Sequence, residues 1–89
     1  MSHLFSAGEI YASIGIQALM AQGYDFTPFL ERHLSGDWGD VDEDDALTNH
    51  YAATHSGRML LSLYDLTSDI FICILTDLGR TTIMLPSEY

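Results

Sequence analysis

Residues 70–75, Ile-Phe-Ile-Cys-Ile-Leu, form the longest unbroken apolar run in the chain. A run of this length without alternation is typical of a strand that is covered on both faces, and it is far too short to cross a bilayer. We therefore expect a strand over residues 69–76, which contains this run, to lie at the centre of a sheet. Residues 58–64 and 81–85 on either side are rich in Leu, Ile, Thr and aromatic side chains, and short polar turns join them to it. The three segments together predict an antiparallel β-meander.

Helices are expected ahead of this meander, at residues that favour helix ends. Ser13 is a suitable N-cap for a helix over residues 14–22, and Gly23 suits the left-handed residue that follows it. Thr27 and Pro28 indicate the start of a second helix, because threonine caps well and proline at the first helical position sacrifices no hydrogen bond.

A third helix is expected over residues 40–55, where Asp40 and Glu43 have the spacing of a capping box and Gly57 follows. The loose alternation of apolar residues in segment 4–12 indicates a short extra N-terminal strand or an ordered arm. The sequence thus predicts an α+β fold in which three N-terminal helices pack on a three-stranded antiparallel β-meander. A chain of 89 residues has room for a single domain, residues 1–89.

Charge is the property that most restricts the function. The chain has 13 acidic residues, three arginines and no lysine, and its formal net charge is −10. Such a surface repels nucleic-acid phosphates and anionic membranes, and it attracts basic partners. The alternative is that the charge serves only to keep a small protein soluble and monomeric.

The acids are densest around the single tryptophan. We take as the candidate partner-binding segment the residues Asp37, Trp38, Asp40, Asp42, Glu43, Asp44 and Asp45. A structural role competes with this one, because carboxylates in the first turn of a helix interact favourably with the helix dipole. Trp38 also allows two interpretations: it packs into the fold as a plug, or it stands exposed as an anchor within a charged rim.

Patterns typical of catalysis or metal binding do not accompany these acids. Asp40, Asp42 and Asp44 alternate as in a calcium loop, but the glycine and glutamate required at its sixth and twelfth positions are missing. The four histidines, at positions 3, 33, 50 and 55, lack the spacing of a zinc site. Cys73 is expected to be buried and unreactive, and the chain has neither a nucleophile elbow nor a phosphate-binding glycine loop. We therefore expect no enzymatic activity, no metal and no cofactor.

The motif Ser-Gly-Asp-Trp-Gly-Asp at residues 35–40 resembles that of a family of small uncharacterised proteins carried by bacterial plasmids, integrative elements and phages. The resemblance covers most of the chain and ends in residues 81–86 and the terminal Glu88 and Tyr89. The hairpin at residues 77–80 is shorter than is usual in that family. The resemblance implies the product of a mobile element. The single cysteine and the lack of a basic N-terminal segment indicate a reducing compartment and no signal peptide, and with the resemblance they imply the cytoplasm of a bacterial host.

Mobile elements encode small acidic proteins that block host defence, and the defence complexes hold DNA in basic grooves. We therefore expect an anti-CRISPR-like or anti-restriction inhibitor whose acidic surface binds directly to the basic surface of a host defence complex. The alternative is a non-catalytic accessory or regulatory protein-interaction module of a mobile element. Such a module would use an apolar surface, for which Tyr24, Phe26 and Phe29 are the candidates.

Overall fold

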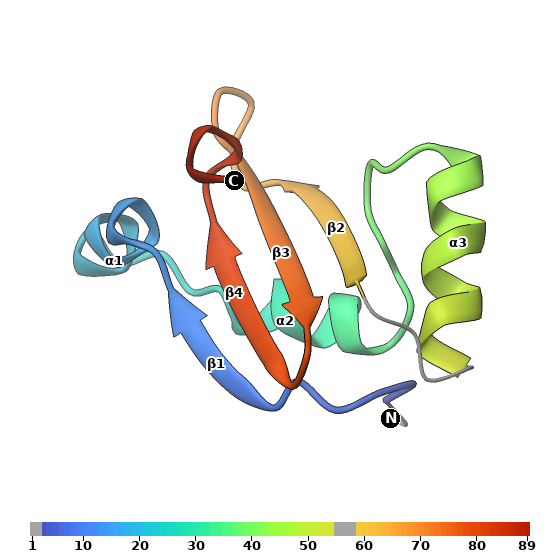
Figure 1. Ribbon diagram of the computed structural model, residues 1–89. Helices are drawn as coiled ribbons and strands as arrows, with labels where there is room; N and C mark the ends of the chain where they lie inside the picture. The colour runs from blue at the N-terminus through green and yellow to red at the C-terminus, as the bar shows by residue number, and fades with distance from the viewer. Residues whose placement is uncertain (1–2, 55–58) are drawn as a thin grey trace.

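The computed structural model describes residues 3–54 and 59–89, and in it a four-stranded sheet is combined with three α-helices (Figure 1). The elements follow one another as β1 (Glu9–Ala12), α1 (Ile14–Ala21), α2 (Thr27–Leu34), α3 (Glu43–Thr54), β2 (Met59–Asp65), β3 (Phe71–Asp77), β4 (Arg80–Met84) and the short 3₁₀ helix η1 (Pro86–Glu88). The predicted helix end at His55, its stop at Gly57 and the strand start at Arg58 lie outside the described residues. No helix in the described ranges is both long and apolar enough to cross a membrane.

The predicted architecture is wrong, although its α+β content is correct. Strands β2, β3 and β4 do pair in antiparallel fashion, but the sheet has the order β1-β4-β3-β2 and is mixed. Strand β1 precedes the helices and pairs in parallel with β4, from Glu9 opposite Arg80 to Ala12 opposite Ile83. All three helices therefore lie between β1 and β2 in the chain. Parallel neighbours need a long crossover, and helices and strands β2 and β3 together fill it here.

The helices differ in how they meet the sheet. Helix α2 crosses behind it, whereas α3 stands beside the outer edge of β2 (Figure 1). Helix α1 begins after Ser13, whose hydroxyl accepts the Ile16 N–H at 3.2 Å, so the predicted N-cap is confirmed. Helix α2 already includes Thr27, so the predicted threonine cap is wrong; the Asp25 carboxylate accepts the Thr27 N–H instead.

The middle of β3 is buried on both faces, as predicted. Ile72, Cys73 and Ile74 are all buried, and burial raises the pKa of the Cys73 thiol above its usual value. Ile72 and Ile74 belong to the core cluster on the face that α1 and α2 cover, together with Ile16, Leu19, Phe26, Tyr64 and Ile83. The strand end at Phe71 is half exposed.

A buried polar chain crosses this face of the sheet at His33 of α2. The imidazole Nδ1 lies 2.5 Å from the Ser62 hydroxyl of β2, and Nε2 lies 2.9 Å from the Thr76 hydroxyl of β3. Thr76 in turn bonds the Thr81 hydroxyl, which donates to the Ala7 carbonyl in the N-terminal segment. Burial lowers the pKa of His33 to about 4. The histidine is thus held neutral and links α2 to three strands.

Acid should destabilise the fold through His33. Because the pKa of His33 is about 4 in the fold against 6.5 ordinarily, the unfolded chain binds an extra proton between these values. The free energy of unfolding should fall as the pH decreases through this window, by on the order of 3 kcal/mol. Urea unfolding of the wild type and of His33→Gln across the window measures this contribution. The free energy of unfolding of the variant should depend less steeply on pH in this window. An equal dependence on pH in both proteins would contradict a buried neutral histidine.

Candidate partner-binding surface

Two groups close the outer edge of β2, where a strand would otherwise leave backbone groups unpaired. The Leu63 N–H donates to the Trp38 carbonyl at 3.1 Å, and the Asp40 N–H donates to the Leu63 carbonyl at 2.7 Å. Further along the edge, the Asn49 side chain of α3 donates to the Leu61 carbonyl at 2.7 Å and accepts the Leu61 N–H at 3.3 Å. The amide thus takes the place of a neighbouring strand. These four bonds hold both the acidic segment and α3 against the sheet.

Gly39 is required for this contact. Its φ is +73°, and a Cβ there would lie 1.9 Å from the Leu63 carbonyl oxygen. Next to it, the Tyr64 hydroxyl donates to the Asp37 carbonyl at 2.6 Å. The segment that carries the tryptophan is therefore fixed to β2 by backbone contacts.

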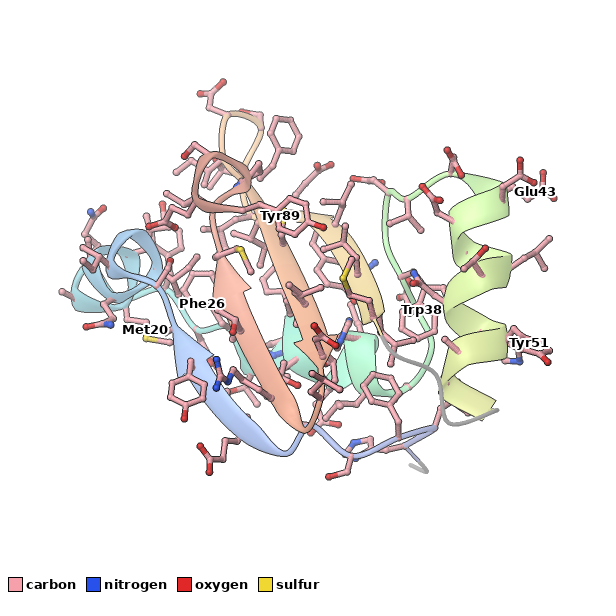
Figure 2. All side chains as sticks on the ribbon, viewed as in Figure 1. Met20, Phe26, Trp38, Glu43, Tyr51 and Tyr89 are labelled. Carbon is pink, nitrogen blue, oxygen red and sulfur yellow. The ribbon has the colours of Figure 1, made fainter. Side chains whose placement is uncertain are left out.

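Asp37 and Trp38 serve mainly to hold the fold together. The Asp37 carboxylate lies 2.7 Å from Arg32, whose hydrogen bond lowers the pKa of Asp37. Trp38 is 6% exposed, stacks on Phe5 and meets His33 edge-on at a centroid distance of 5.7 Å. Figure 2 shows its ring between the sheet and α3. The interpretation of Trp38 as a plug is confirmed, and the exposed anchor is wrong.

The acids that follow Trp38 are exposed, and α3 starts later than predicted. It begins at Glu43, and Asp42 accepts the Asp45 N–H at 2.9 Å. Asp42 therefore caps the helix, and the capping box predicted from Asp40 is wrong. The first turn is acidic, as predicted, which suits the helix dipole. In Figure 2 the Glu43 side chain points away from the sheet. Asp37 is exposed as well but is paired with Arg32, and the other exposed acids of the predicted segment are Asp40, Asp42, Glu43, Asp44 and Asp45.

Asp65 at the end of β2 joins these acids. Partial desolvation raises the pKa of Asp65, and hydrogen bonding with Asp40 and repulsion from its charge raise it further. The two residues are far apart in the sequence, and the bridge at Leu63 brings them together. Sequence reasoning missed Asp65, and no local signal could have revealed it. We call Asp65 and the five exposed acids of the segment that are not paired with Arg32 the acidic surface.

A groove of 330 Å³ lies between α3 and β2, next to the acidic surface. Asp45 contributes a carboxylate to it, and its apolar lining comes from Val41, Met59, Leu61 and Leu63. Arg32 is engaged with Asp37, and Arg80 lies 5.4 Å from the ring centroid of Tyr11. Among residues 3–54 and 59–89, neither arginine forms an ion pair with the acidic surface. The arrangement can bind a cationic group and an apolar side chain side by side.

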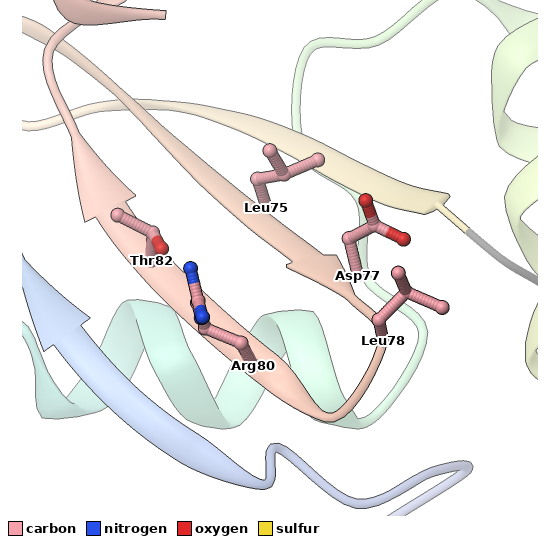
Figure 3. Close-up of a pocket in the computed structure, with 5 residues that line it drawn as sticks. All are labelled: Leu75, Asp77, Leu78, Arg80 and Thr82. Carbon is pink, nitrogen blue, oxygen red and sulfur yellow. The ribbon is translucent and has the colours of Figure 1, made fainter.

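Other surfaces show less convergence of chemical groups. A 270 Å³ pocket at the β3–β4 hairpin has one carboxylate, Asp77, and one guanidinium, Arg80, in its lining (Figure 3). In the part of the chain that is described, no three His, Cys, Asp or Glu side chains group to hold a metal ion. The aromatic candidates for an apolar surface lie largely inside: Phe26 is buried, and Tyr24 and Phe29 are partly buried against the core.

The chain matches no protein-family model, no curated protein and no solved structure. The resemblance to proteins of mobile elements therefore stays a prediction.

A matched pair of glycine substitutions tests the contact with β2. Gly39 and Gly79 have similar φ values, +73° and +77°, but a Cβ at Gly79 has open space around it. Gly79→Ala should cost about 1–2 kcal/mol, the usual cost of a left-handed residue with a side chain. Gly39→Ala should cost about 1–3 kcal/mol more, because the backbone must move away from Leu63. Urea unfolding measures both, and equal losses would contradict the close approach.

The proximity of Asp40 and Asp65 is tested by NMR titration of the side-chain carboxyl carbons. Asp40→Asn removes the neighbouring charge, so the pKa of Asp65 should move down toward its ordinary value. Asp77→Asn makes the same change in net charge at the end of β3, next to Met59 at the other end of β2, and should leave the titration of Asp65 unchanged. An unaltered Asp65 titration in Asp40→Asn would show that the two carboxyls do not interact.

Proposed function

We propose that this protein is a mobile-element inhibitor of a bacterial host defence complex, anti-CRISPR-like or anti-restriction. It acts by contact alone: the acidic surface binds the basic groove in which the complex holds nucleic acid. The observation that carries the proposal is the gathering of six exposed carboxylates, from Asp40 to Asp45 and at Asp65, none of which forms an ion pair with Arg32 or Arg80. This gathering supports the acidic surface as the contact with the partner.

The carboxylates would inhibit the complex by competing with DNA phosphates for the same basic side chains. Double-stranded DNA presents one negative charge per about 1.7 Å of its axis, and lysines and arginines of the groove neutralise these charges. Carboxylates on a folded domain interact with the same side chains. Because Asp40 is fixed to Leu63 and Asp42 caps α3, little conformational freedom is lost on binding. The rigid presentation supports a role in binding beyond the capping role of the first turn.

The pair Asp40 and Asp65 supports arginine as a contact residue of the target. Two carboxyls that repel each other gain most from a shared cation, and a guanidinium offers several donors in one plane. The groove beside them adds an apolar lining at Leu61 and Leu63. A target surface with an arginine next to an apolar side chain would fit both the carboxyl pair and the apolar groove.

Phage plating tests the function directly. Expression of the protein in bacteria whose CRISPR or restriction system blocks a phage should raise the plating efficiency of that phage. The variant with Asp42→Asn, Glu43→Gln, Asp44→Asn and Asp45→Asn should lose the effect, while asparagine keeps the helix cap. The control variant, with Glu9→Gln, Glu31→Gln, Asp69→Asn and Asp77→Asn, makes the same change in net charge elsewhere and should protect the phage like the wild type.

Equal protection by the two variants would contradict the acidic surface as the contact, and no gain in plating with the wild type would contradict the inhibitor. With the purified defence complex, affinity should fall steeply between about 50 and 200 mM salt, because the contact is electrostatic. Retained binding with a flat salt response would also contradict the mechanism.

A further inference from the structure

Strand β1 ends the sheet on the side opposite β2, and no other described strand pairs with its outer edge. The Glu9 and Ser13 N–H groups donate to Gly79 and Ile83, so these residues turn their backbone toward β4. Because alternate residues of a strand point their backbone groups to opposite sides, Ile10 and Ala12 face outward. The Gln17 side chain donates to the Ala12 carbonyl at 2.8 Å. The Ile10 N–H and carbonyl and the Ala12 N–H have no partner among the described residues.

The two outer strands of the sheet differ in whether their outward backbone groups are bonded. At β2 the outward groups of Leu61 and Leu63 are all bonded, by Asn49 and by the segment around Gly39. An unpaired edge is a template on which another extended chain can form main-chain hydrogen bonds. This protein closes one edge of its sheet and leaves the other available.

An apolar groove of 380 Å³ runs beside β1 on the face of the sheet that α1 and α2 cover. Ile10, Met20, Tyr24 and Leu30 contribute to its lining, and Ile10 and Met20 are 52% and 43% exposed. A strand added to β1 would direct alternate side chains toward this groove. The site thus offers main-chain bonds and side-chain contacts together.

Charge selects the occupant of the edge. Asp25 borders the groove, and its carboxylate accepts the Thr27 N–H, which lowers its pKa. Glu9 lies on β1 itself, opposite Arg80 of β4. A second copy of this chain, with a net charge of −10, would bring like charges together. We propose that the outer edge of β1 binds an extended basic segment of a partner protein, with apolar residues at alternate positions and Lys or Arg between them, as a fifth strand.

The probe is a capped eight-residue peptide that alternates lysine and valine, titrated into the ¹⁵N-labelled full chain. Amide exchange at Ile10 and Ala12 should slow at least tenfold at saturation, because their N–H groups become bonded or covered. Two N-methylated peptides serve as matched controls with identical charge: one methylated at every valine, the other at every lysine. Only one of these two sets of N–H groups faces β1. One methylated peptide should bind at least tenfold more weakly, and the other should stay within about twofold of the parent.

Each other outcome overturns the inference. If the two methylated peptides bind with equal affinity, whether this equals or falls below that of the parent peptide, main-chain pairing plays no part. Loss of binding in the variant neutralised at residues 42–45, with shifts at Leu61 and Leu63, would assign the peptide to the acidic surface. Slow exchange at Ile10 and Ala12 without peptide, together with a dimer in sedimentation, would assign the edge to a second copy. Because the edge and the acidic surface are separate, either proposal can fail without the other.

Discussion

The closure of the outer edge of β2 is the constraint on which the rest of the structure depends. Leu61 and Leu63 have backbone groups that no strand satisfies, and Asn49 and the backbone of Trp38 and Asp40 bond them instead. Backbone groups that are buried without a partner are costly, so these contacts determine where α3 and the acidic segment can lie against β2. Burial of Trp38 against Phe5 and His33 follows from the same placement.

The negative charges divide into two groups once their partners are known. Asp25 and Asp37 accept hydrogen bonds from backbone N–H groups near them, and Glu88 accepts from Ser13, Gly15 and Leu85, which lowers its pKa and links the C-terminus to the start of α1. These carboxylates stabilise the fold. The acidic surface is different, because apart from the Asp42 cap its side chains serve no such contact in the described chain. A basic partner would reduce the repulsion among these carboxylates. The proposed function is assigned to this surface for that reason.

Local patterns in the sequence were sufficient to predict most of the helices and strands, though not how the strands pair. The apolar run at residues 70–75 indicates the central strand, and Ser13 indicates the start of α1, because these signals depend on neighbours in the chain. The parallel pairing of β1 with β4 depends on contacts across some seventy residues, and segment 9–12 has no apolar pattern that names a partner. The contacts of Asn49 with Leu61 and of Asp65 with Asp40 also join residues that are distant in the sequence. The position of α3 at β2 and the membership of Asp65 in the acidic surface could therefore be found only from the structure.

Amide hydrogen exchange of the isolated protein tests the central claim, that one edge of the sheet is closed and the other is open. Leu61 and Leu63 have bonded N–H groups at the β2 edge, whereas those of Ile10 and Ala12 at the β1 edge have no partner within residues 3–54 and 59–89. The account predicts that Leu61 and Leu63 exchange at least tenfold more slowly than Ile10 and Ala12, after correction for intrinsic rates. Fast exchange at Leu61 and Leu63, equal to that at Ile10 and Ala12, would contradict it.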